Sequence, residues 1–110
     1  MSPERRLQGQ CAEKIAADFL TRAGLTVVHR NYRCRFGEID LIARDGDTLV
    51  FVEVRFRSRT DYGSAAESIT VAKQRRLIVA ASCFQQEKES NDACRFDVIA
   101  LNRLSPDAVK

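Results

Sequence analysis

The sequence has little of what very small, exported or membrane-spanning proteins rely on. It contains no tryptophan, two prolines, five glycines and a single histidine in 110 residues. No apolar run reaches the length that crosses a bilayer, and the polar N-terminal stretch MSPERRLQGQ leads into no signal-peptide segment. These absences predict a cytoplasmic protein with no membrane partner.

The four cysteines, Cys11, Cys34, Cys83 and Cys94, are scattered and form no C-x-x-C pair. In a chain without an export signal we expect them to be reduced, structural thiols. With His29 as the one histidine, no zinc-ligand pattern exists. We expect His29 to pack or hydrogen-bond on its strand.

The chain has the size of one globular domain, which can bury a core without disulfides or a structural metal. Its 45% hydrophobic and 30% charged residues are typical of such a domain. We predict a single domain over 1–110, with its core at about 8–102 and a frayed tail at 103–110.

The first half of the chain predicts a helix followed by three strands. A helix is expected over 3–23, starting as late as residue 8, with Gly24 just past its end. Its apolar stripe comprises Ala12, Ile15, Ala16, Phe19, Leu20 and Ala23. Segments 25–33, 37–44 and 48–56 are rich in β-branched and aromatic residues and predict strands, the last two joined at Asp45-Gly46-Asp47.

The second half predicts a polar loop, a helix and one more strand. Thr70 suits the N-cap of a helix over 71–87, although Ser64 with Glu67 offers a rival capping box. The stripe of this helix comprises Leu77, Ile78, Ala81 and Phe84. Segment 94–101 predicts the last strand, so the fold class is α/β, in the order α-β-β-β-α-β, with a mixed sheet flanked by helices.

Three acids interrupt the apolar strands: Glu38, Asp40 and Glu53. A two-residue turn at Asp45-Gly46 or at Gly46-Asp47 puts Asp40 and Glu53 on one face, and the second of these places them directly opposite each other. A three-residue loop would put them on opposite faces.

Two close carboxylates repel unless a cation or proton lies between them, and their oxygens suit Mg²⁺ or Mn²⁺. Arg55 would point into the same space and stabilise charge on a phosphate. The alternative is a solvated face on which Arg55 pairs with an acid. Glu53 favours the first interpretation because its strand is otherwise apolar.

Basic charge is concentrated around these strands. The net charge is +3 overall, whereas residues 30–35 carry +3, residues 55–76 carry +4 and the rest of the chain carries −4. Such a distribution is typical of a surface that docks a polyanion, although a solvated face is the ordinary alternative.

The segments GQCAEKIAADFL, GEIDLIA, FVEVRFRS, KQRRL and RFDVIAL occur in this order from residue 9 to residue 101. Together they resemble the YraN-like family of uncharacterised bacterial proteins. These are predicted endonucleases of the PD-(D/E)xK nuclease superfamily, distantly related to archaeal Holliday junction resolvases. The resemblance implies a restriction-endonuclease-like three-layer core.

The resemblance also implies a metal-binding, catalytic role for Asp40 and Glu53, with Glu13 completing the acidic cluster. It places Arg55 where the superfamily has a catalytic lysine. Arginine can bind a phosphate but cannot act as a general base, which puts proton transfer at this position in doubt. Glu13 has a plainer interpretation, a surface ion pair with Lys14 or Arg5.

Three functions from different classes remain open. The first is a Mg²⁺- or Mn²⁺-dependent endonuclease for DNA, including branched DNA, with a homodimer as one arrangement. Its phosphate-backbone contacts would come from Arg57, Lys73, Arg75 and Arg76. The second is a nucleic-acid-binding module that keeps the nuclease fold without catalysis. A protein-interaction domain is the third and plainest alternative.

Overall fold

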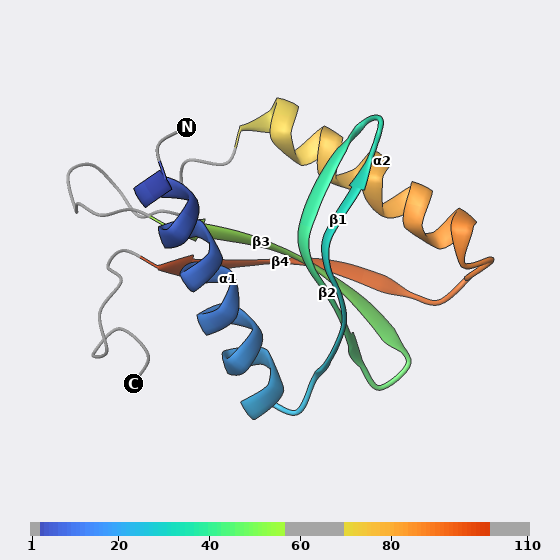
Figure 1. Cartoon of the computed structure of the whole chain (residues 1–110). Helices are drawn as coiled ribbons and strands as arrows, with labels where there is room; N and C mark the ends of the chain where they lie inside the picture. The colour runs from blue at the N-terminus through green and yellow to red at the C-terminus, as the bar shows by residue number, and fades with distance from the viewer. Residues whose placement is uncertain (1–2, 57–69, 102–110) are drawn as a thin grey trace.

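The computed structural model describes residues 3–56 and 70–101, and shows a four-stranded sheet between two helices (Figure 1). The elements are α1 (Pro3–Arg22), β1 (Thr26–Cys34), β2 (Gly37–Asp45), β3 (Thr48–Phe56), α2 (Val71–Glu87) and β4 (Cys94–Leu101). This is the predicted α/β class and element order. The rival capping box at Ser64 and Glu67, and Arg57, lie outside the described residues.

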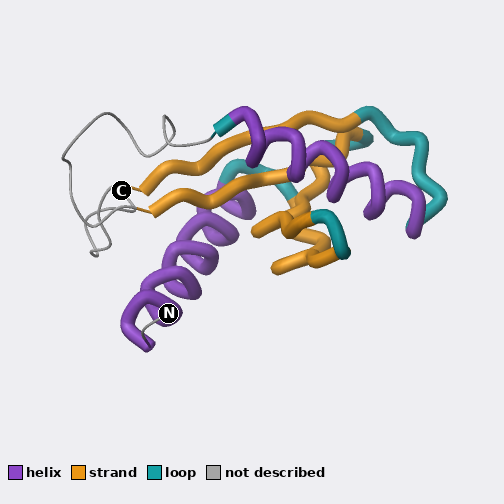
Figure 2. The backbone as a smooth tube through the Cα atoms, turned by 90° about the horizontal axis from the view of Figure 1, so that it is seen from above, coloured by secondary structure: helices purple, strands orange, loops and turns teal. Residues whose placement is uncertain are grey.

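The sheet has the spatial order β1-β2-β3-β4. β1, β2 and β3 pair antiparallel, whereas β4 pairs parallel to β3. A parallel pair cannot be joined by a tight turn, so the chain crosses over between these two strands and α2 lies in this connection. α1 and α2 lie against opposite faces of the sheet (Figure 2), which accounts for apolar residues on both sides of β2 and β3.

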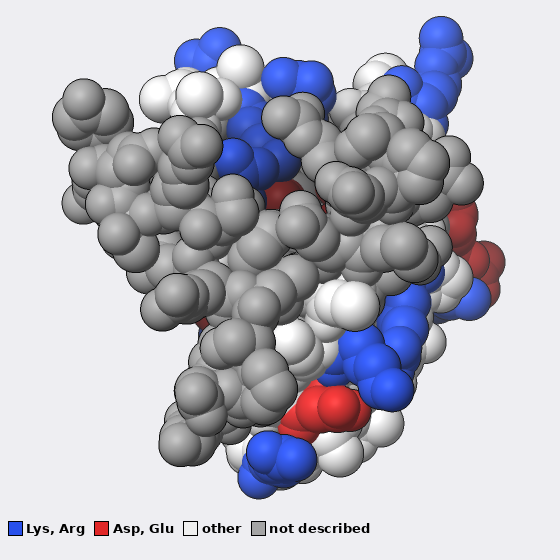
Figure 3. Space-filling view, turned by 60° about the vertical axis from the view of Figure 1, so that its left-hand side comes forward, with Lys and Arg blue, Asp and Glu red and all other residues white. Residues whose placement is uncertain are grey.

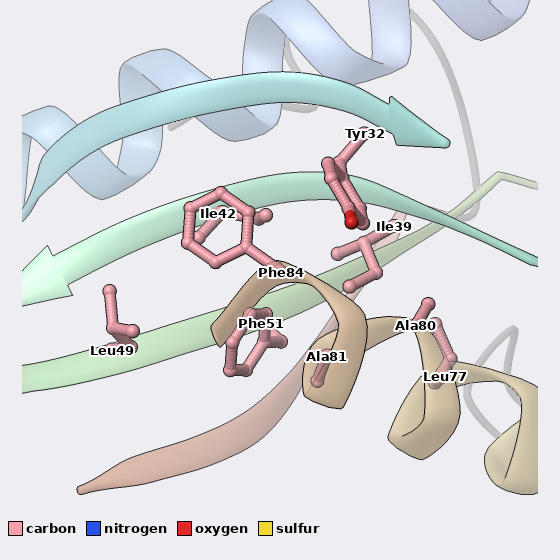
Figure 4. Close-up of a cluster of buried hydrophobic side chains, with 9 residues drawn as sticks. All are labelled: Tyr32, Ile39, Ile42, Leu49, Phe51, Leu77, Ala80, Ala81 and Phe84. Atoms are coloured by element: carbon pink, nitrogen blue, oxygen red, sulfur yellow. The ribbon is translucent and has the colours of Figure 1, made fainter. Parts of the chain in front are cut away.

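Each face of the sheet carries its own hydrophobic cluster. The α2 face joins Tyr32, Ile39, Ile42, Leu49 and Phe51 to residues of the helix (Figure 4). The α1 face is built from Leu41, Ala43, Val50 and Val52 of the strands with Ala16, Ala17 and Leu20 of the helix. The middle strands therefore contribute side chains to both clusters.

Both helices are rotated slightly from the predicted stripes. Phe19 is 57% exposed and Ile78 is 53% exposed, whereas Ala17 and Ala80 are buried. Small side chains at the contact let a helix approach the sheet closely, which turns the larger neighbours outward. The predictions for Phe19 and Ile78 were therefore wrong.

The β2–β3 hairpin has the second of the two predicted registers. Asp45 pairs with Thr48, and the ladder continues through Ala43–Val50 to Leu41–Val52. The turn residues are Gly46 and Asp47, and Gly46 has φ 61°. A glycine with positive φ at the first turn position suits the tight turns that match strand twist.

We expect Gly46→Ala to lower the free energy of unfolding by about 1 kcal/mol, because a side chain is strained at this φ. A Cβ at Gly46 would meet no atom within 4 Å, so crowding adds nothing to that cost. Urea denaturation of this variant beside Asp47→Ala, its exposed neighbour, measures the difference. Equal midpoints for Gly46→Ala and wild type would contradict the assignment.

The regular alternation of side chains between the two faces of the sheet is interrupted at the same level in β1 and β2. Pairing runs through Arg30–Leu41 and resumes at Tyr32–Ile39, skipping Asn31 and Asp40. Asn31 has φ 53°, a left-handed conformation that asparagine tolerates better than most residues. Beyond this break the strands change face, so that Ile39 and Ile42, three residues apart, both reach the α2 cluster.

Candidate functional site

Glu53 is the buried acid at the centre of the site. Its neighbours Phe51 and Val52 belong to the core, and Glu53 itself is only 5% exposed. Its Oε1 lies 3.1 Å from Nζ of Lys73 and 3.9 Å from Nη1 of Arg55. Two cations thus compensate one buried carboxylate, as the cost of burying a charge requires.

Lys73 is held at this place by the start of α2. The N-cap residue Thr70 accepts a hydrogen bond at its hydroxyl from the backbone N–H of Lys73, at 3.1 Å. The predicted N-cap is thereby confirmed. Because the cap fixes the first turn of the helix, it also fixes the direction from which the amine reaches Glu53.

Asp40 lies beside Glu53 at the break in the sheet. In the observed register it is the residue that would come opposite Glu53, but the backbone ladder has ended at Leu41–Val52. Oδ2 of Asp40 instead accepts a hydrogen bond from the backbone N–H of Val54, at 2.8 Å. A regular ladder would direct this N–H to a carbonyl of β2, so the carboxylate replaces a backbone acceptor.

The pKa of Asp40 rises to about 7 from its usual 3.8. Burial is the largest cause, followed by the negative charge of Glu53, while the N–H of Val54 acts in the opposite direction. A carboxyl group that titrates near neutral pH next to a second acid is a common feature of functional sites. Two carboxylates this close repel each other unless a proton or a positive charge compensates them.

Glu13 of α1 flanks this pair. Its charge is one of the smaller causes that raise the pKa of Asp40. Its own pKa is raised, chiefly by burial, although a hydrogen bond from the side chain of Asn31 counteracts this. Within residues 3–56 and 70–101, no three acids, cysteines or histidines are grouped closely enough to hold a metal ion. The third-ligand role of Glu13 stays a prediction.

The other acids singled out from the sequence lie at the surface. Glu38 pairs with Arg33 at 3.2 Å, and both side chains are more than half exposed. Asp97 of β4 pairs with Arg95 at 3.1 Å with 39% of its side chain exposed. Such exposed pairs contribute little to stability.

The basic residues are not equally available to a partner. Arg75 and Arg76 are exposed on α2, whereas the amine of Lys73 is engaged by Glu53. In Figure 3, lysine and arginine side chains gather at several separate places, with acidic side chains beside or beneath them. The described surface in this view is therefore mixed rather than continuously basic.

The part of the site that the sequence did not predict is the break itself. Asn31 was assigned to an ordinary strand, and its left-handed backbone and contact with Glu13 were missed. Asparagine is depleted in strands and enriched at positive φ. The presence of Asn31 inside the predicted strand 25–33 was therefore the available signal for an irregular backbone.

The fold and these residues define a class, namely small α/β proteins that hold a compensated pair of carboxylates where two strands of a mixed sheet separate. Residues 12–101 match the uncharacterised protein family UPF0102, and the chain belongs to this family. The predicted likeness to the YraN-like family is thereby confirmed.

Curated relatives support the assignment. The chain is 53% identical over 98 residues to a UPF0102 protein of Herminiimonas arsenicoxydans, covering 89% of this chain and 79% of the relative. It is 56% identical over 98 residues to one of Hahella chejuensis, covering 88% and 79%. A third, of Aeromonas hydrophila, is 49% identical over 111 residues, covering 98% and 85%. No described helix is long and apolar enough to cross a membrane.

Proposed function

We propose that the protein is a Mg²⁺- or Mn²⁺-dependent endonuclease that hydrolyses phosphodiester bonds of DNA, including branched DNA. The observation that carries the proposal is the pair of Asp40 and Glu53. One carboxylate is buried among core residues, and the other has a pKa raised to about 7 beside it. Core strands rarely keep such a pair, because apolar residues would pack there at lower cost.

The donor set fits the proposed cation. Carboxylate oxygens are hard ligands, and Mg²⁺ is usually held by one or two of them, with waters and substrate phosphates completing its shell. Asp40 and Glu53 would hold the cation, with Glu13 near enough to act on Asp40 through its charge. When bound, the metal would lower the pKa of a water and polarise a phosphate oxygen.

The side chains of the protein would supply the remaining charge. In the resting site Lys73 and Arg55 neutralise Glu53. With a divalent cation held by the carboxylates, Glu53 would need neither side chain for neutralisation, and both would be available to the phosphate. Arg55 would then bind the phosphate as a fork, and Lys73 would offer the amine that the superfamily carries at the Arg55 position. Arg57, Arg75 and Arg76 are proposed to bind the DNA backbone without reading bases.

A cytoplasmic location and a homodimer belong to the same proposal. A branched substrate presents two equivalent strands, which two copies of one site could cut together. Analytical ultracentrifugation with and without junction DNA tests whether the protein forms the homodimer.

Calorimetric titration with Mg²⁺ and Mn²⁺ tests the site directly. We expect wild type to bind and the Asp40→Ala/Glu53→Ala double variant, verified as folded by circular dichroism, not to bind. The titration is repeated with duplex and four-way junction DNA present, because substrate phosphates can complete the shell. Equal heats for the two proteins under both conditions would refute the metal site.

The second candidate function, a nucleic-acid-binding module without catalysis, is favoured by one observation. Lys73 and Arg55 already compensate Glu53, so the site is stable as a salt-bridged cluster. This function predicts salt-sensitive DNA binding that is unchanged by EDTA and by Asp40→Ala. Loss of DNA binding at low salt, either in EDTA or in the Asp40→Ala variant, would count against this function.

A further inference from the structure

Two cysteines that are far apart in the sequence meet on the α2 face of the sheet. Cys34 ends β1, and Cys83 lies in the C-terminal half of α2. The two side chains are close enough to interact, since Cys34 is among the groups that raise the pKa of the Cys83 thiol. Both side chains are half-buried and pack against the α2-face cluster, whereas Cys11 and Cys94 are exposed.

The contact belongs to a well-fixed interface between β1 and α2. Tyr32, two residues before Cys34, packs edge-on against Phe84 with ring centroids 5.3 Å apart. The hydroxyl of Tyr32 donates a hydrogen bond to Oε1 of Glu87 at 2.9 Å. Figure 4 shows Tyr32 of β1 and Phe84 of α2 within the same hydrophobic cluster.

The strand residue that pairs with Cys34 is fixed against the same helix. Gly37 is the β2 partner of Cys34, and a Cβ at Gly37 would lie 3.4 Å from Cβ of Arg76. The backbone around Cys34 is therefore anchored on both sides, which keeps the two thiols adjacent. Adjacent sulfurs on anchored backbones are the condition for a disulfide that needs little movement.

We propose that Cys34 and Cys83 form a reversible intramolecular disulfide when the protein meets hydrogen peroxide. The thiolate of one of the two cysteines attacks one peroxide oxygen, the O–O bond breaks, and water leaves after protonation, giving a sulfenic acid. The sulfur of the other cysteine then attacks this sulfenic sulfur, and the oxygen leaves as a second water. The two thiols lose two electrons, which reduce one peroxide molecule.

The same disulfide forms whichever of the two thiols reacts with the peroxide first, because the second thiol then resolves the sulfenic acid.

The bond would tie β1 to α2 and close a loop that contains β2, β3 and the carboxylate pair. Closing a long loop constrains the unfolded chain and thereby stabilises the folded one. We expect the midpoint of thermal unfolding to rise by roughly 5 °C or more on oxidation and to return after dithiothreitol.

Peptide mapping of the wild-type protein tests the pairing. After peroxide treatment and alkylation of free thiols, trypsin should release the dipeptide Cys34-Arg35 joined to the peptide of residues 77–88, which contains Cys83. Reduction should separate them. Cys11 and Cys94 serve as internal controls, since their peptides should not appear in this cross-link.

Three results would overturn the proposal. The first is that Cys34 and Cys83 stay alkylated, and therefore unoxidised, at peroxide doses that already oxidise Cys11 and Cys94. The second is a cross-link that joins two chains. The third is a disulfide that pairs Cys34 with Cys94. Because the mapping uses the wild-type chain, it does not depend on any variant folding. Cys83→Ser adds a second measurement, in which peroxide should leave the unfolding midpoint unchanged.

Discussion

Glu53→Gln is expected to lower the rate of metal-dependent DNA cleavage by about 100-fold or more, because it removes the charge that would hold the cation while keeping the shape of the side chain. The carboxylate is buried, so an acid from the surface cannot take its position without displacing core residues. The rate is measured on duplex and four-way junction DNA with Mg²⁺ and with Mn²⁺.

Glu38→Gln is the matched control for this prediction. It makes the same chemical change on the neighbouring strand, but Glu38 is exposed and pairs only with Arg33 among the ion pairs of the described chain. We expect its cleavage rate to stay within about twofold of wild type, as for other surface substitutions. Equal loss in both variants would show that general charge, and not the site, governs the rate. Unchanged cleavage by Glu53→Gln would refute the proposed mechanism.

The largest expected effect on stability concerns Asp40. Its pKa is about 7 in the folded protein and 3.8 when unperturbed. Between these values the folded state keeps a proton that the unfolded state releases, so the free energy of unfolding falls as the pH rises through this window. At about 1.4 kcal/mol per pH unit, the loss from pH 4 to pH 8 amounts to about 2–4 kcal/mol.

Asp40→Asn should remove most of this loss. Asparagine keeps an acceptor oxygen for the N–H of Val54 but carries no charge to oppose Glu53. We therefore expect the variant to be more stable than wild type at pH 8 and similar at pH 4. Urea denaturation at both pH values measures the difference, with Asp47→Asn, an exposed acid on the same hairpin, as control.

Mg²⁺ links this prediction to the proposed function. A cation bound between the two carboxylates should stabilise wild type at pH 8, by mass action, and leave Asp40→Asn little affected. A wild-type protein whose stability does not change between pH 4 and pH 8 would contradict the assigned environment of Asp40.

Most of the fold was predictable because its signals are local. The Asp45-Gly46-Asp47 turn defined the hairpin, Thr70 marked the start of a helix, and apolar runs on both sides of the strands predicted a covered sheet. The sequence left three turns open, two of two residues and one of three, because residue types in the Asp45-Gly46-Asp47 segment do not alone fix the register of the hairpin.

The site was predicted only in part, because its geometry depends on contacts between distant segments. Asp40 and Glu53 were assigned to a common site from strand alternation, yet the break at Asn31 changes how Asp40 reaches its neighbours. Lys73 was expected to bind the DNA backbone, and its approach to Glu53 comes from how α2 lies on the sheet. No local pattern encodes that helix placement, just as none encoded the outward turn of Phe19.

The parallel pairing of β4 with β3 has a consequence for synthesis on the ribosome. β3 leaves the ribosome long before β4, which supplies its neighbour along the whole of Leu49–Phe56 and stacks Phe96 on Phe51 at 5.5 Å. Until then, nascent chains carry an unpaired edge with the sequence TLVFVEVRF, a segment of high β-propensity. Chains that stall or terminate before Cys94 should therefore associate with one another through this edge, and their solubility depends on the last strand of the sheet.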